Sequence, residues 1–313
     1  MAKTEDITYA SPKVHYKRSF GDILISIITY IVYTGFAFVC VYPFYYIFIN
    51  SISDNQLSER GKVLFLPKGI HFTNYASVMK LDGLFDAAKI SLARTLIGTV
   101  VVVFTSAFLG YMFTSKTMWG RKFWYRVIAA TMYFNAGIIP LYITMSNLKL
   151  VNNFWIYILP TAISPFYMIL CKTFVEAIPG ELRDAAMIDG AGTLTIFFRI
   201  MIPVIKPILA TVAIFTAVNQ WNAFQDTLIY ITDKKLYTLQ FVLYQYITQS
   251  SSIKALLNGS SSSANIAASM AKMQTATSVR MTVTIVVVTP ILLVYPFFQR
   301  YFTKGIMIGA VKG

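Results

Sequence analysis

Six long apolar segments set the main limit on how this chain of 313 residues can fold. Each is close to the roughly 20 apolar residues that a helix needs to cross a membrane. Only 13% of the residues are charged, against roughly 25% in soluble domains. The sequence therefore predicts an all-α integral membrane protein with six transmembrane helices and excludes an ordinary water-soluble globule. The expected spans are Ile23–Ile49, Leu92–Thr114, Val127–Met145, Phe154–Cys171, Pro207–Tyr230 and Thr282–Phe302.

The distribution of basic residues predicts the orientation of these spans. The formal net charge is +14, and 15 of the 27 Lys and Arg residues fall in four segments. These segments are the two terminal tails and the loops that follow the second and fourth spans. Because Lys and Arg close to span ends stay on the cytoplasmic side, both termini are expected in the cytoplasm. The positive charge is thus a topology signal, and we expect no nucleic-acid partner.

This topology divides the chain into one transmembrane domain with loops and tails. The first apolar run is too long for the core of a cleavable signal peptide, so we expect it to remain as an anchor. The predicted parts are the cytoplasmic N-terminal tail 1–22, the six-helix domain 23–302 with its cytoplasmic loop 172–206 and outer loops 50–91 and 231–281, and the cytoplasmic C-terminal tail 303–313.

The ionisable residues favour neither ion-coupled transport nor catalysis. Arg94, Asp226 and Arg280 fall near span ends, where we expect their charged groups to reach the membrane surface. A secondary transporter or channel would usually need ionisable groups deep in the membrane or interrupted repeats. An integral membrane enzyme would need a catalytic cluster, but His15 and His71 are isolated. These two alternatives stay open with less support, and we expect no catalytic and no metal site.

The cytoplasmic loop between the fourth and fifth spans carries the most specific pattern. Pro179 suits the first turn of a helix. Glu181 and Asp184 follow near the N-terminus of that helix, where negative charge is favoured. The pair Asp189–Gly190 predicts its end, because glycine readily takes a left-handed cap. Thr193 is expected to cap a second helix, so the loop should form two short helices joined by a sharp turn.

This loop resembles the EAA motif of permease subunits in ABC importers, whose pattern is roughly E-A-A, then G, then I-x-L-P. The matching residues are Asp184–Ala185–Ala186, Gly190 and Ile200–Met201–Ile202–Pro203. Asp184 stands for Glu, which could weaken a contact while keeping the charge, and Ile202 stands for Leu. The residues around the motif look like the carbohydrate-uptake branch, and Gly309–Gly313 resembles the tail of the smaller maltose-importer permease. The resemblance covers almost the whole chain and extends to permeases for complex oligosaccharides.

The resemblance implies a type I importer subunit in the cell membrane, for sugars and in particular oligosaccharides. Its partners would be a second permease in a heterodimer, two cytoplasmic ATPases and an extracytoplasmic sugar-binding protein. The chain has no Gly-x-x-x-x-Gly-Lys-Ser/Thr loop, so ATP and Mg would be bound by the ATPases and this chain would need no cofactor. The residues implied at the ATPase contact are Glu181, Asp184, Ala185, Ala186, Asp189, Gly190, Ile200, Ile202 and Pro203, with Lys312 and Gly313 of the tail.

Polar side chains within the third and fifth spans are candidates for the sugar pathway. Amides and aromatic rings can bind sugar hydroxyls and ring faces, but in a membrane they also join helices to one another. Contact with the partner permease is therefore the favoured alternative interpretation. In the maltose-type relative, moreover, most sugar contacts come from the partner. The candidates are Tyr133, Asn135, Asn219, Gln220, Trp221 and Asn222.

Overall fold

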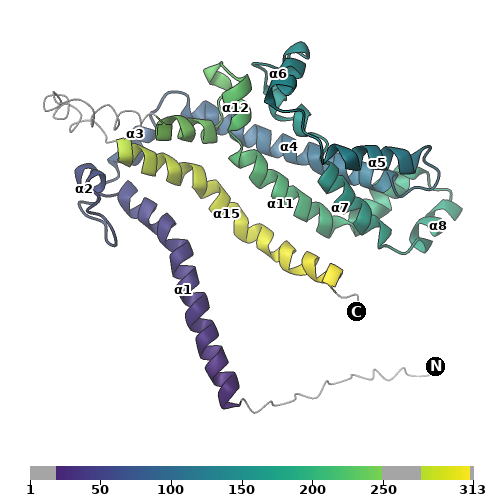
Figure 1. Cartoon of the computed structure of the whole chain (residues 1–313), viewed down its shortest axis with the longest axis horizontal. Coiled ribbons are helices and arrows are strands. Elements are labelled where there is room, and N and C mark those ends of the chain that lie inside the picture. Colours follow the sequence, from purple (N-terminus) through teal and green to yellow (C-terminus); the bar gives the residue numbers. More distant parts are fainter. Residues whose placement is uncertain (1–18, 249–275, 311–313) are drawn as a thin grey trace, which may run out of the picture. The chain divides into compact units, whose positions relative to one another are not determined.

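The computed structural model describes residues 19–248 and 276–310, and the chain forms two units, Met1–Ile47 and Phe48–Gly313. All regular structure in these described ranges is helical, which confirms the predicted all-α class (Figure 1). The 3-10 and π segments are labelled η, and residues 239–248 are also helical. The helices are α1 (Phe20–Ser51), α2 (Asn55–Glu59), α3 (Thr73–Val78), α4 (Leu84–Met112), α5 (Arg121–Thr131), α6 (Ile138–Asn147), η1 (Phe154–Tyr157), η2 (Leu159–Thr161), α7 (Pro165–Glu176), α8 (Glu181–Ile188), α9 (Thr193–Thr195), η3 (Ile196–Met201), α10 (Ile202–Val204), α11 (Lys206–Asn222), α12 (Gln225–Tyr230), η4 (Lys234–Leu236) and α15 (Ala276–Ala310).

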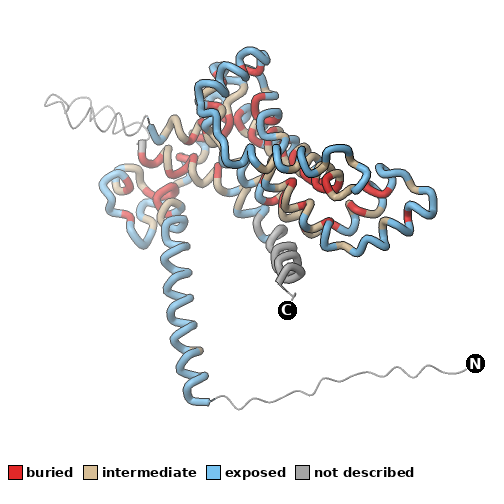
Figure 2. The backbone as a smooth tube through the Cα atoms, turned by 45° about the vertical axis from the view of Figure 1, so that its right-hand side comes forward, coloured by how far each residue is buried: buried red, intermediate tan, exposed pale blue. Residues whose placement is uncertain are grey.

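The first unit consists, in its described part, of the greater portion of α1. This helix is apolar on all sides, and Figure 2 shows it exposed along almost its whole length. A helix that is hydrophobic all round is typical of a membrane span. Pro43 lies inside α1, where a membrane helix tolerates it because neighbouring groups can satisfy the freed carbonyl.

Three helices of the described chain are long and apolar enough to cross a membrane, namely α1, α4 and α15. Two bent pairs raise the number to five if each counts as one span. The pair formed by η1–η2 and α7 bends by 47°, and the pair formed by α9–α10 and α11 bends by 79°. The helices thus agree with several membrane spans.

The predicted third span is interrupted, which is a departure from the continuous helix expected over Val127–Met145. Helix α5 ends at Thr131 and α6 begins at Ile138. Between them, Gly137 has a φ of 84°, and its N–H donates to Asn135 Oδ1 at 2.9 Å. This local turn satisfies the amide without a helix and lets the glycine take a conformation that other residues avoid.

The predicted fifth span, Pro207–Tyr230, is likewise two helices. Helix α11 ends at Asn222, and α12 begins at Gln225. Ala223 between them is extended, with a ψ of 129°. The break leaves backbone carbonyls without helical partners, and in a membrane such groups need another donor within the protein.

Helix α4 is the centre of the second unit. It packs along α7 and α11, and α11 also packs against α15 (Figure 1). Gly110 permits the close crossing with α7, because a Cβ there would lie 2.8 Å from Cys171 Cβ and 2.9 Å from Lys172 N. The two neighbours belong to the α7 backbone region, so the space for even one methyl group is missing.

The two ends of α4 contact different parts of the fold. Near its C-terminus, Tyr111 belongs to a buried cluster that includes Phe197 of η3. Near its N-terminus, Ser91 Oγ accepts a hydrogen bond from Leu239 N at 2.8 Å. At 1.5 Å of rise per residue, Arg94 and Tyr111 lie about 25 Å apart along the helix. Helix α4 therefore connects a pocket at Arg94, described below, to the buried cluster that contains Phe197 of η3.

Candidate functional site

Helix α8 is a short, well-terminated helix in the predicted cytoplasmic loop, at the end of the second unit where α5 and α7 lie (Figure 1). The N–H of Ala191 donates to Ala186 O at 3.0 Å, and the N–H of Gly190 donates to Met187 O at 3.1 Å. These two bonds form a Schellman motif, and Gly190 takes the left-handed φ of 79° that this motif requires. The predicted helix stop at Asp189–Gly190 is confirmed.

The two alanines of the motif point in different directions. Ala186 is only 8% exposed and belongs to the same buried cluster as Phe197 and Tyr111. Ala185 is exposed to the outside of the chain. The small size of Ala186 is thus explained by packing within this protein, whereas Ala185 remains available to a partner.

The exposed side of α8 is acidic at its start and apolar at its end. Glu181 and Asp184 lie in the first turn, where the helix dipole favours their charge, and both are exposed. Asp189 occupies the C-cap and is also exposed. Ile188 is 87% exposed, and Met187 beside it is 51% exposed. This surface has the features of a docking site.

The second short helix differs from the prediction at its start and in its type. It begins at Thr193 itself, so Gly192 and not Thr193 occupies the N-cap, and no side chain caps it. From Ile196 to Met201 the segment is a π-helix, η3. Phe197 in η3 is fully buried and packs edge-on to Phe108 with ring centroids 5.4 Å apart. This ring anchors the loop to α4.

The end of the loop turns sharply into α11. Ile200 and Ile202 are half-buried, and Pro203 is exposed within α10. Pro207 lies in the first turn of α11, where its ring prevents a helix from continuing back through Ile205. The two prolines explain the 79° bend between these helices. The tail residues Lys312 and Gly313 lie outside the described residues.

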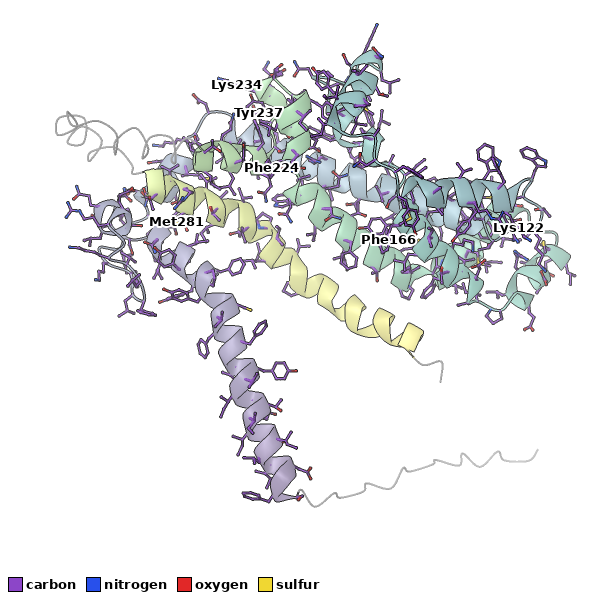
Figure 3. The ribbon with its side chains drawn as sticks, in the orientation of Figure 1. Lys122, Phe166, Phe224, Lys234, Tyr237 and Met281 are labelled. Atoms are coloured by element: carbon purple, nitrogen blue, oxygen red, sulfur yellow. The ribbon has the colours of Figure 1, made fainter. Side chains whose placement is uncertain are left out.

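A pocket of about 390 Å³ lies among α4, the start of α7, the end of α11 and the break that precedes α12. Figure 3 shows Phe224 in this break and Phe166 on α7. Its wall has both apolar and polar surface, and it includes two of the predicted pathway residues, Asn219 and Gln220. The lining residues are Arg94, Val102, Thr161, Ile163, Ser164, Pro165, Tyr167, Thr216, Asn219, Gln220, Ala223 and Asp226.

Arg94 is the most buried charged residue of this pocket wall, with an exposure of 1%. Its Nη1 and Nη2 donate to the two carboxylate oxygens of Asp226, at 3.1 and 2.5 Å. Its Nε and Nη2 donate to Gln220 Oε1 at 3.2 and 3.0 Å, and Nη1 also donates to Ala223 O at 3.2 Å. The Tyr157 ring lies 4.4 Å from its Cζ. All three guanidinium nitrogens are therefore engaged, and Arg94 supplies a donor to the broken backbone of the fifth span.

The prediction for Arg94 and Asp226 was wrong. We expected both to reach the membrane surface, but the structure pairs them with each other inside the protein. The sequence did contain one indication of this packing. Gly98 lies four residues after Arg94, so the two residues share one face of the helix. A Cβ at Gly98 would lie 2.9 Å from Gln220 Nε2, so this glycine makes room for the partner of Arg94. Arg280 does lie near the start of α15, as expected.

The other predicted pathway residues lie away from the pocket lining. Trp221 Nε1 donates to Val287 O on α15 at 3.1 Å, and Asn222 Oδ1 accepts from Gln240 Nε2 at 3.0 Å. Both contacts join parts of the same chain. Tyr133 is 86% exposed, and Asn135 forms the turn between α5 and α6. The structure thus brings Asn219 and Gln220 together, while these four residues do not line this pocket.

Sequence comparisons place the chain next to sugar transport proteins. It is 33% identical over 278 residues to the polygalacturonan/rhamnogalacturonan transport system permease protein YtcP of Bacillus subtilis, covering 89% of this chain and 94% of YtcP. It is 34% identical over 284 residues to protein LplC of the same organism, covering 89% and 92% of the two chains. The arabinooligosaccharides transport system permease protein AraQ of Halalkalibacterium halodurans is 28% identical over 95% of this chain and its own full length. No protein-family model matches the sequence.

The fold is similar to that of a solved transporter chain. The crystal structure of a bacterial ABC transporter involved in the import of the acidic polysaccharide alginate contains a chain with a TM-score of 0.79 and 28% identity. The similarity covers 91% of this chain and 99% of that chain. Both ends of α4, the pocket and the α8 segment therefore belong to a fold that is used in an importer.

Proposed function

This chain belongs to the permease subunits of carbohydrate ABC importers, and we propose that α8 is the element through which it couples to a cytoplasmic ATPase. The chain functions in sugar import as a membrane-embedded transport subunit. ATP hydrolysis is assigned to separate ATPase subunits, which would hold ATP and Mg. The similarity to ABC importer permeases supports neither of the rival functions, a secondary transporter or channel and a membrane enzyme.

One observation carries the coupling proposal, namely that α8 is exposed on one side and anchored to the transmembrane core on the other. The exposed side offers Ala185, Ile188 and the acidic residues Glu181 and Asp184. The anchored side joins α4 through the buried cluster around Phe197. A partner that holds α8 differently in two states would shift the equilibrium between two arrangements of the membrane helices.

We extend this proposal to a complete assembly in the cell membrane. A second permease subunit would form the other half of the pathway, and two ATPases would dock onto the pair. An extracytoplasmic binding protein would deliver the sugar. The pocket at Asn219 and Gln220 would be this subunit's part of the pathway. Affinity purification of the chain in mild detergent from its native membrane should recover a second permease and an ATPase, and their absence from a folded preparation would contradict the assembly.

The proposed topology has six spans with both termini and the α8 loop in the cytoplasm. The interrupted third and fifth spans would each cross the membrane as two shorter helices. A cysteine at Leu148, which is 61% exposed after α6, should then react with an impermeant thiol reagent added to intact cells. A cysteine at Gly192 should react only after the cells are opened. Both belong in a Cys40→Ser background, since Cys40 is exposed, and the reverse pattern would refute this orientation.

A further inference from the structure

The pocket beside Arg94 contains neutral groups that can still form hydrogen bonds. It also contains an ion pair in which every guanidinium nitrogen already donates one. The proposal built on this contrast rests on the function proposed above, because it concerns the cargo of a sugar importer. We propose that this pocket binds one uncharged ring of the transported carbohydrate. The Arg94–Asp226 ion pair would make the pocket select against rings that carry a carboxylate.

The spare capacity comes from neutral side chains. Asn219 is exposed, and its Oδ1 has no hydrogen-bond partner among the described residues, while its Nδ2 has only a long contact of 3.4 Å to the Tyr167 hydroxyl. Thr216 is 4% exposed, and its Oγ1 has no partner in the described chain. Sugar hydroxyls both donate and accept hydrogen bonds, so they can pair with the Asn219 amide oxygen and the Tyr167 phenol. The unpaired Thr216 Oγ1 is itself buried, so the pocket depends on the other two groups.

The apolar part of the lining suits the other face of a sugar ring. Ile163, Pro165 and the ring of Tyr167 contribute hydrocarbon surface to the same pocket. A pyranose presents C–H groups on its faces and hydroxyls at its rim, so it matches a wall that has both kinds of group. The volume of about 390 Å³ is near the lower end of the roughly 300–1,000 Å³ found for small-molecule pockets. The pocket thus fits a ring of an oligosaccharide and not a whole long chain.

The charges of the pocket are already paired. Each guanidinium nitrogen of Arg94 donates to Asp226, Gln220 or Ala223, so Arg94 has no free nitrogen for a sugar carboxylate. The Asp226 side chain is 23% exposed and that of Arg94 is 2% exposed, so the negative member of this neutral pair is the more accessible one. A uronate would therefore approach a like charge, or would displace Asp226 and leave that half-buried carboxylate without its partner. Both outcomes are unfavourable, since breaking a buried ion pair is strongly destabilising.

Thiol protection in the assembled transporter tests this selectivity. Ile163 is 56% exposed in the pocket lining, so Ile163→Cys in a Cys40→Ser background provides a reporter that leaves the polar groups in place. The assembly with its permease partner and ATPases is placed in lipid nanodiscs, and the labelling rate is measured with each sugar. The probes are two matched pairs, galactotriose with trigalacturonate and mannotriose with trimannuronate.

We expect at least one neutral sugar to slow labelling, with half-protection at a concentration at least tenfold below that of its uronate counterpart. Asp226→Asn leaves the Arg94 charge without its carboxylate partner. The half-protection concentration of the uronate divided by that of the neutral sugar should therefore fall at least threefold. A Leu148→Cys reporter outside the pocket should be protected by none of the four sugars. The double variant Arg94→Gln with Asp226→Asn keeps the wall neutral and should lie between the wild type and Asp226→Asn.

Equal or better protection by the uronates in the wild-type pocket would overturn the proposal, and so would protection by neither member of either pair. An unchanged ratio in an intact Asp226→Asn assembly would overturn the role of the ion pair. If Asp226→Asn does not assemble, the wild-type ratio still decides the uncharged-ring proposal. Failure of the proposed function would be seen separately, as a purified chain that binds no ATPase.

Discussion

Both terminal nitrogens of Arg94 on α4 donate to the two carboxylate oxygens of Asp226 on α12, although the residues are 132 positions apart in the chain. The bidentate pair closes the wall of the pocket and joins α4 to the broken fifth span. Because Arg94 also donates to Ala223 O and Gln220 Oε1, the pair organises the break as well as the pocket.

Removal of one partner of this pair should be more harmful than removal of both. We expect Asp226→Asn alone to destabilise the purified permease by about 3–5 kcal/mol, because it leaves the buried Arg94 charge unpaired, and Arg94→Gln to cost less, because Asp226 is half-buried. The double variant should recover a large part of this loss. Denaturant unfolding of the four proteins in detergent gives the coupling energy. Additive losses in the double variant would show that the two charges are independent.

The crossing of α4 and α7 should not tolerate a methyl group at Gly110. The added Cβ would meet the Cys171 Cβ and the Lys172 backbone, which cannot rotate away as a flexible side chain would. We expect Gly110→Ala to cost about 1–3 kcal/mol of stability, the usual cost of overpacking. Gly35→Ala in α1 is the matched control, since nothing lies within 4 Å of a Cβ there. Equal melting temperatures for both variants would contradict the close crossing.

The two alanines of the motif should respond differently to an increase in size. Ala186→Leu should lower the stability of the permease itself by about 1–3 kcal/mol, because Ala186 packs into the buried cluster. Ala185→Leu should leave the stability unchanged within about 0.5 kcal/mol, as for other surface substitutions, and should reduce ATPase retention. The checks are thermal unfolding of the isolated permease and the amount of ATPase that co-purifies. Loss of ATPase without loss of stability for Ala186→Leu would reverse the assignment.

The end of α8 should depend on glycine at one position only. At Gly190 a β-carbon is strained by roughly 1–2 kcal/mol, because the φ of 79° is left-handed. We expect Gly190→Ala to reduce ATPase activity that is stimulated by the loaded binding protein. Gly180→Ala, where φ is −62° and no atom lies within 4 Å of the new Cβ, should have little effect. A similar loss in both variants would mean that the cap conformation is not the cause.

The long apolar helices and the end of α8 could be predicted from short stretches of sequence. The apolar runs of α1, α4 and α15 are long and uninterrupted, so their helices follow from length and composition. The stop of α8 was predictable because Asp189–Gly190 is a strong cap signal.

The parts that sequence reasoning missed depend on contacts between distant segments or on turns inside apolar runs. The break at Asn135–Gly137 has turn residues, but the surrounding hydrophobicity favoured one continuous span. The break at Ala223 has no turn signal, and it is held by Arg94 from another helix. The inward direction of Ala186 likewise depends on a buried cluster to which η3 and α4 contribute side chains. Burial of Arg94 could not be separated from exposure at a span end by position alone.

Photo-crosslinking from the exposed side of α8 is the most direct test that this permease is coupled through that helix. A benzoyl-phenylalanine at Ile188, which is 87% exposed, would be irradiated in the purified assembly, with Leu148 as the control position. We expect an adduct between the permease and the ATPase from position 188 and none from position 148. An assembly that contains the ATPase but gives no such adduct from position 188, or gives it from position 148, would contradict the account.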